Sequence, residues 1–89
     1  MKVPPAEQPG EEHNERVEEA RRLRRLQVMM SMVMSVLGQD PDLTLEEAAE
    51  MAANARRAAL SMFPDKELAY DIIYRPRLQR LMNERFRLH

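Results

Sequence analysis

Apolar residues recur along this chain at spacings of three and four, which is the period of an amphipathic helix. No stretch alternates apolar and polar residues at every second position, so the sequence predicts no strand. We expect an all-α fold, a three- or four-helix bundle with a long first helix over about residues 11–37. This helix should form an antiparallel hairpin with a second helix over about 45–63. Two shorter helices, split near Pro76, should follow.

The first ten residues contain three prolines and one glycine and offer little to bury. We expect this segment, 1–10, to be a flexible N-terminal tail in front of a single helical domain over 11–89. A chain of 89 residues fits one domain. A domain this small buries a modest share of its surface on folding, so its stability is marginal if it stands alone. Association with another chain is a common way to add stability.

Several residues have the spacing of helix boundary signals. Gly38 follows the last apolar residue of the first helix, and we expect it to stop that helix in the left-handed conformation. Thr44 and Glu47 have the spacing of a capping box at the start of the second helix. Pro64 should end the second helix, and Asp65 should cap the third.

Pro76 interrupts the apolar pattern of the last quarter of the chain. The proline disfavours helical geometry at Arg75, the residue before it. One outcome is a break, with Pro76 in the first position of a fourth helix and Tyr74 half buried beside it. The other outcome is one kinked helix. We favour the break.

The second helix carries an apolar stripe made mostly of alanine, which lets helix axes approach closely. Ser31 and Ser35 are small residues one turn apart on the first helix, and we expect them to face this stripe. The expected core consists of Leu26, Met30, Val33, Leu37, Leu45, Ala52, Ala55, Ala59, Phe63, Ile72, Ile73, Leu78, Leu81 and Met82.

The run of residues 28–37 has no charge and contains four of the eight methionines. A helix that is apolar on every side must be covered on every side. The run is about half as long as a membrane-spanning helix, so we expect no membrane contact. A chain this short supplies little cover, so we expect a second copy, as a homodimer, or another protein. The residues expected to bind this partner are Met29, Met30, Met32, Val33, Met34 and Val36.

Arginines dominate the C-terminal end, where Glu84 is the single acidic residue after residue 74. Arginine contacts phosphate and nearby aromatic rings can stack on bases, which gives nucleic acid as an alternative partner. Against it, the chain has an isoelectric point near 6.1, and helix-spaced pairs such as Arg75 with Asp71 can satisfy the charges internally. The candidate phosphate-binding residues are Arg75, Arg77, Arg80, Arg85 and Arg87.

Residues that would support catalysis or metal binding are scarce in this sequence. The chain has no cysteine, and His13 and His89 lie near opposite ends. Thioethers bind Cu(I), but the methionines at two-residue spacing point in different directions on a helix. We therefore expect no enzyme, no metal site and no cofactor.

These observations favour a function that depends on contact with other molecules. We expect a small protein–protein interaction module, an adaptor, regulator or assembly subunit, that self-associates through its methionine-rich first helix. The N-terminal sequence has no apolar signal segment, so we expect a cytoplasmic location. The alternative is a nucleic-acid-associated protein that uses its arginine-rich C-terminal region.

Overall fold

The computed structural model describes residues 11–87. The predicted tail, residues 1–10, lies outside this range, as do the last two residues of the chain. The described residues contain helices and no strand, which confirms the all-α prediction. The helices are α1 (Glu11–Gln39), α2 (Leu45–Met62), α3 (Glu67–Ile73) and α4 (Arg75–Phe86).

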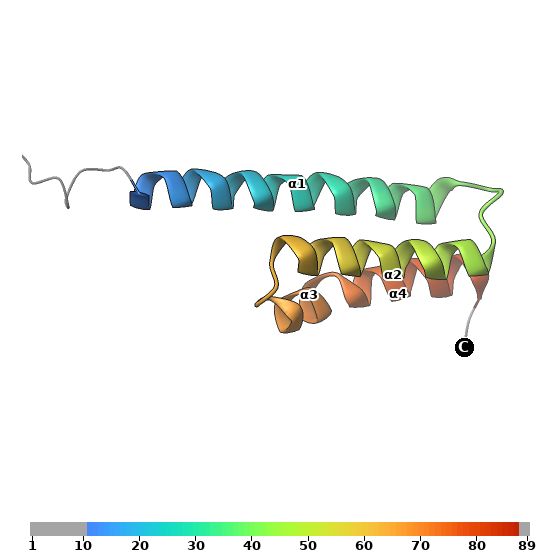
Figure 1. Cartoon of the computed structure of the whole chain (residues 1–89). Coiled ribbons are helices and arrows are strands. Elements are labelled where there is room, and N and C mark those ends of the chain that lie inside the picture. Colours follow the sequence, from blue (N-terminus) through green and yellow to red (C-terminus); the bar gives the residue numbers. More distant parts are fainter. Residues whose placement is uncertain (1–10, 88–89) are drawn as a thin grey trace, which may run out of the picture.

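The long helix α1 lies antiparallel to α2, as predicted (Figure 1). Helix α3 and helix α4 together form a bent helix that returns along α2, so that α1 packs against both α2 and α4. The N-terminal half of α1 extends beyond the other helices (Figure 1). The other helices therefore cover only the C-terminal half of α1, and only on one side of it.

Helix α1 ends differently from the prediction. Gly38 lies inside the helix, and no glycine of the described residues has a positive φ. The last residue of the helix is Gln39, because Pro41 disfavours helical geometry at Asp40. The Asp40 backbone N–H still donates to the Val36 carbonyl at 3.0 Å, and the Asp40 carboxylate accepts the Asp42 N–H at 3.0 Å. An Asx turn, rather than a left-handed glycine, therefore makes the corner.

The predicted capping box at the start of α2 is confirmed. The Thr44 hydroxyl accepts the Glu47 backbone N–H at 3.1 Å, and the Glu47 carboxylate accepts the Thr44 backbone N–H at 3.1 Å. The two bonds satisfy backbone N–H groups that the first turn of a helix leaves without partners.

Replacing Thr44 with alanine should lower the free energy of unfolding by about 1 kcal/mol, because one N–H loses its acceptor. Urea denaturation followed by circular dichroism measures this loss. Thr44→Ser keeps the hydroxyl and should retain most of the stability. Equal stability of the alanine variant and the wild type would show that the capping box does not stabilise α2.

Helix α3 begins after Lys66, whose side chain makes no capping hydrogen bond, so the prediction that Asp65 caps it is wrong. The reason is a turn: the Lys66 N–H donates to the Phe63 carbonyl at 3.1 Å, which places Asp65 inside the turn. Phe63 itself is the C-terminal cap of α2, close to the predicted end of that helix.

Helices α3 and α4 meet at a single residue, Tyr74, with φ −98° and ψ −38°. The Tyr74 N–H donates to the Tyr70 carbonyl and the Tyr74 carbonyl accepts the Leu78 N–H, so helical hydrogen bonds continue across the junction. Pro76 lies in the first turn of α4, where its missing N–H needs no partner. Arg75 is helical despite preceding a proline, so the junction is closer to the kinked helix than to the favoured break: α3 and α4 are joined as a bent helix, with the bend at the half-buried Tyr74.

The core lies where α2 and the α3–α4 pair meet the C-terminal half of α1. Met30 and Leu37 of α1 are fully buried, and three alanines of α2 pack near them, which fits the predicted close approach. Ser31 and Ser35 do not face the alanines; both are exposed. The buried residues are Leu26, Met30, Leu37, Ala48, Ala55, Ala59, Tyr70 and Leu78.

The prediction that Ile72 and Ile73 lie in the core is wrong. Ile72 is 64% exposed and Ile73 is 49% exposed, while Tyr70 is buried. Because α3 is short, turning the Tyr70 ring toward Met30 leaves the aliphatic residues outside. Leu45, another predicted core residue, is 41% exposed. The other predicted core residues outside the buried set are partly buried: Val33, Ala52, Phe63, Leu81 and Met82.

Candidate interaction surface

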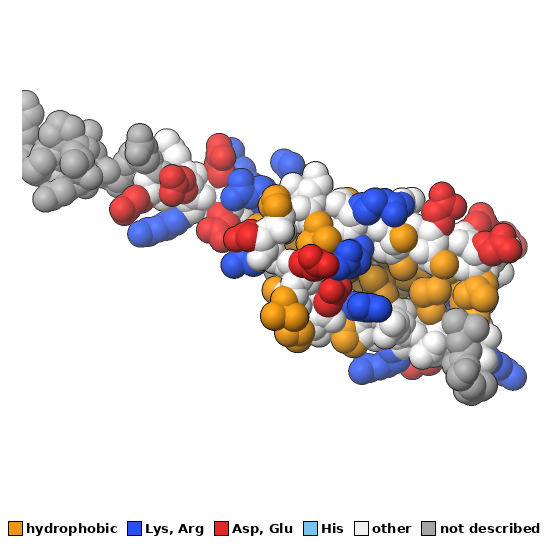
Figure 2. All heavy atoms as spheres, turned by 60° about the horizontal axis from the view of Figure 1, so that its bottom comes forward, with side chains coloured by type: hydrophobic (Ala, Val, Ile, Leu, Met, Phe, Trp, Pro, Cys, Tyr) orange, Lys and Arg blue, Asp and Glu red, His pale blue; other side chains and the backbone are white. Residues whose placement is uncertain are grey.

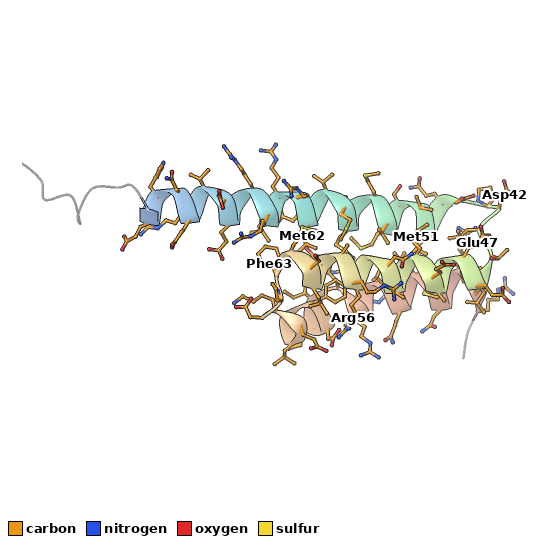
Figure 3. The ribbon with its side chains drawn as sticks, viewed as in Figure 1. Asp42, Glu47, Met51, Arg56, Met62 and Phe63 are labelled. Carbon is orange, nitrogen blue, oxygen red and sulfur yellow. The ribbon has the colours of Figure 1, made fainter. Side chains whose placement is uncertain are left out.

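One side of α1 carries exposed apolar residues in the middle of the helix. Val28 is 55% exposed and Met32 is 64% exposed. Two adjoining shallow grooves run along this side, and α1 alone lines both. Figure 3 shows side chains along the side of α1 that faces away from the other helices, whereas Met29 and Val33, at the edge of this surface, also line a groove toward α2. We call this surface the outer face of α1, and its lining residues are Arg21, Arg24, Arg25, Gln27, Val28, Met29, Ser31, Met32, Val33 and Ser35.

The uncharged run 28–37 is divided between the outer face and the core. Met32 is exposed, whereas Met30 is fully buried inside its own chain. Met30 therefore has no exposed surface for a partner, and the prediction that Met30 binds one is wrong. Helices α2 and α4 lie on one side of α1 and bury only the residues at helical spacing on that side. The other predicted partner-binding residues are partly buried: Met29, Val33, Met34 and Val36.

Arginines lie at the N-terminal end of the outer face, and acidic residues follow the C-terminal end of α1. Arg21, Arg24 and Arg25 are exposed at its N-terminal end, and none of them makes an ion pair within residues 12–87. At the C-terminal end the chain carries Asp40 and Asp42, and the last turn of α1 has no basic residue. The backbone carbonyls of the helix terminus add partial negative charge there, and Arg85 donates to one of them, the Leu37 carbonyl. The outer face is thus basic at its N-terminal end and apolar in its middle.

The C-terminal arginines do not share one surface. Arg85 is partly buried and donates to the Leu37 carbonyl at 3.1 Å, so it helps to end α1. Arg75 lines the groove between α2 and α4, and Arg77 lines a different groove beside α1 and α3. Arg87 follows α4 with a positive φ of 54°. The structure therefore spreads the candidate phosphate-binding residues over several sides of the molecule; Arg80 is exposed on α4.

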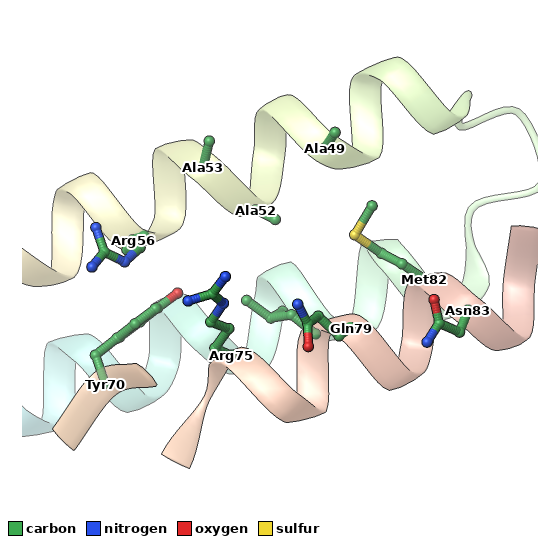
Figure 4. Close-up of a pocket in the computed structure, with 10 residues that line it drawn as sticks. Ala49, Ala52, Ala53, Arg56, Tyr70, Arg75, Gln79, Met82 and Asn83 are labelled. Carbon is green, nitrogen blue, oxygen red and sulfur yellow. The ribbon is translucent and has the colours of Figure 1, made fainter. Parts of the chain in front are cut away.

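A groove between α2 and α4 has a volume of about 740 Å³. In Figure 4 alanines of α2 line one wall, and Gln79, Met82 and Asn83 of α4 line the other. Two arginines, Arg56 and Arg75, lie at one end beside Tyr70. The Tyr70 hydroxyl donates to the Met30 sulfur at 3.9 Å, and burial raises the pKa of Tyr70.

Arg56 is held by two carboxylates of α3. Its Nε donates to Asp71 Oδ1 at 3.0 Å, and its Nη2 donates to Glu67 Oε1 at 2.6 Å. The hydrogen bonds from Arg56 lower the pKa of Asp71 below its ordinary value. The predicted pair of Asp71 with Arg75 is replaced by this one. The charge of Arg56 is therefore satisfied within the chain, and its contacts with Glu67 and Asp71 fix α3 against α2.

We expect the pKa of Asp71 to rise toward its ordinary value in Arg56→Gln, because the carboxylate loses its hydrogen-bond donor. The stability that this pair contributes should be fully present above about pH 4 and lost as the pH falls through the lower pKa of folded Asp71. NMR titration of the Asp71 carboxyl carbon measures the shift. Arg57→Gln, a neighbouring exposed arginine, is the control; an equal shift in both variants would contradict the assignment.

A second exposed apolar surface lies on α3, and the sequence pattern did not indicate it. Leu68 is 73% exposed and Ile72, one turn later, is 64% exposed. Figure 2, which brings this side of the molecule forward, shows hydrophobic side chains beside a cluster of acidic and basic ones. Beside α3 a pocket of about 440 Å³ opens toward Leu23 of α1 and Phe63. The guanidinium carbon of Arg22 lies over the Phe63 ring, 5.8 Å from the ring centroid.

Comparisons with known proteins give no further guide: no protein-family model matches the chain, and neither a curated protein nor a solved structure is significantly similar to it. Within the described residues, no three His, Cys, Asp or Glu side chains come together as a metal site. None of the described helices has the length and apolar character needed to cross a membrane.

Proposed function

We propose that this chain is a small protein–protein interaction module that self-associates through the outer face of α1. The observation that carries the proposal is the exposure of Val28 and Met32 on a helix whose opposite side is already packed. Burial of apolar surface stabilises association by roughly 25 cal/mol per Å². Methionine side chains are flexible, so such a surface adapts readily to the shape of its partner.

The chain would then act as an adaptor, regulator or assembly subunit, by binding and without catalysis. The N-terminal half of α1 extends beyond the other helices (Figure 1). It would remain available for contact when the outer face is covered. A cytoplasmic location, without membrane contact, belongs to the same proposal.

The alternative partner, nucleic acid, has less support because the C-terminal arginines are dispersed and Arg85 is bound to the end of α1. We expect no electrophoretic shift of a labelled single-stranded oligonucleotide at low salt. A shift that weakens steeply as the salt concentration rises would favour the alternative.

Met32→Glu should abolish self-association, because the dimer would have to bury two carboxylates in its apolar centre. Size-exclusion chromatography with light scattering at about 100 µM measures the molar mass. Both methionine and glutamate favour helices, so the fold should be retained, as circular dichroism would show.

Leu68→Glu is the matched control, since it adds the same charge to the apolar surface of α3, where Leu68 is 73% exposed. We expect this variant to associate as the wild type does. Association that survives Met32→Glu and is lost in Leu68→Glu would place the interface on α3 and contradict the proposal.

A further inference from the structure

The pocket beside α3 occupies a space that the helices leave open. Among the described residues, the backbone of α1 lies close to α2 and α4 but not to α3. The pocket lies between α1 and α3, near the C-terminal end of α2, and we call it the α1–α3 pocket. Its volume is about 440 Å³, and pockets of roughly 300–1,000 Å³ between helices are common sites for small molecules. Apart from Gln27, it shares no lining residue with the outer face of α1.

The α1–α3 pocket reaches from the surface to the core and is mainly apolar. The buried residues Leu26, Ala59 and Tyr70 line its floor. Leu23, which is 46% exposed, and Ile73, which is 49% exposed, line its open side. An apolar ligand in the pocket would therefore remove from water two large side chains that the fold leaves exposed.

Helices α3 and α4 present one continuous face to the pocket across their bend. The residues of this face follow the helical spacing of three and four, with apolar and aromatic side chains in the middle and a cation at each end. They are Lys66, Ala69, Tyr70, Ile73, Tyr74 and Arg77. The two cations lie at most about 16 Å apart along the helix, at 1.5 Å per residue.

The charged residues that line the pocket are both cations. Lys66 and Arg77 are exposed, and neither makes an ion pair within residues 12–87. Asp65 and Glu67 flank Lys66 in sequence but do not line the pocket. Arg22 adds a third cation nearby, since its guanidinium lies over a phenylalanine ring that lines the pocket. A ligand in the pocket therefore meets positive charge at the rim and apolar groups below it.

We propose that the α1–α3 pocket binds a medium-chain fatty acid, with the alkyl chain among the apolar side chains and the carboxylate at the cationic rim. The apolar floor favours a chain without polar groups, because a buried polar group that lacks a partner lowers affinity. The cations favour a negative headgroup, and the guanidinium of Arg77 can donate two parallel hydrogen bonds to a carboxylate. This site does not depend on self-association, which we propose for the outer face.

Tyrosine fluorescence reports on this pocket, because the chain has no tryptophan and both of its tyrosines line the pocket. Titrating the full chain at about 5 µM with decanoate should give a saturable change in emission. Each buried methylene strengthens binding about fourfold, so octanoate, two methylenes shorter, should bind roughly fifteenfold more weakly. A tyrosine emission that does not respond to decanoate up to about 5 mM would overturn the proposal.

The cationic rim is tested from the ligand and from the protein. Decyltrimethylammonium carries the same alkyl chain with a positive headgroup, so it should bind at least about tenfold more weakly than decanoate. The double variant Lys66→Gln/Arg77→Gln should bind decanoate about tenfold more weakly than the wild type and lose this preference for the anion. Both side chains are exposed, so the variant should keep its fold, as circular dichroism would show.

Arg21→Gln/Arg25→Gln is the matched control, since it removes two exposed arginines beside the apolar residues of the outer face. This variant should bind decanoate as the wild type does. If it binds decanoate more weakly while Lys66→Gln/Arg77→Gln keeps the wild-type affinity, the fatty acid lies on the outer face and the proposal is wrong. Equal affinity of the wild type for decanoate and decyltrimethylammonium would also overturn it, because the rim would then select no anion.

Discussion

Replacing Met30 with alanine should lower the free energy of unfolding by about 2–5 kcal/mol. Met30 is fully buried, and its sulfur accepts a hydrogen bond from the Tyr70 hydroxyl of α3. Truncation would remove apolar contacts and leave a cavity where α1 meets α3. A domain of this length has a total stability of only about 4–13 kcal/mol, so the loss is a large fraction of it. Urea denaturation followed by far-ultraviolet circular dichroism measures the change.

Met32→Ala is the matched control, because it is the same chemical change two residues along the same helix. Met32 is 64% exposed, so its truncation should cost less than about 0.5 kcal/mol in the monomer. Both variants are best compared at about 1 µM, where little dimer should form. Similar losses for the two variants would show that the core does not lie on the Met30 side of α1.

Tyr70→Ala should cost about 3–5 kcal/mol, comparable to the loss of a buried phenylalanine. Tyr70 is 5% exposed, lies at the end of the groove between α2 and α4, and contacts the Tyr74 ring at a centroid distance of 5.6 Å. It is the buried residue of α3, so its loss should detach α3 from the core. Thermal or urea denaturation would give the loss, and a stable Tyr70→Ala variant would contradict this role.

Tyr70→Phe separates the ring from its hydroxyl. The hydroxyl donates only to a thioether, a weak acceptor, so this variant should lose less than about 1 kcal/mol at neutral pH. Burial raises the pKa of Tyr70, so the folded state favours the protonated phenol. The stability of the wild type relative to Tyr70→Phe should therefore fall as the pH rises above about 10. A difference that does not change with pH would contradict the burial of this hydroxyl.

The long helices and the capping box could be predicted because their signals are local. Helix α1 has a repeated apolar pattern over several turns, and Thr44 with Glu47 forms a box within four residues of sequence. Helix α3 spans seven residues, fewer than two turns. Its aliphatic residues and Tyr70 are all apolar enough to be buried, so the pattern alone could not decide which of them faces the core.

The outer face could be predicted only in part. Every residue of the run 28–37 is apolar or small, so the sequence shows that the run needs cover and not which side receives it. The positions of α2 and α4 decide that Met30 is buried and Met32 is exposed. The sequence could not predict the position of Arg85 either, because its side chain donates to the Leu37 carbonyl, and the two residues are far apart in sequence.

The central claim is that a second copy of the chain covers the exposed side of α1. Sedimentation equilibrium of the wild-type chain from about 1 to 200 µM tests this claim most directly. We expect the molar mass to rise with concentration from 10.5 kDa toward twice that value. A molar mass that stays at 10.5 kDa over the whole range would contradict the claim.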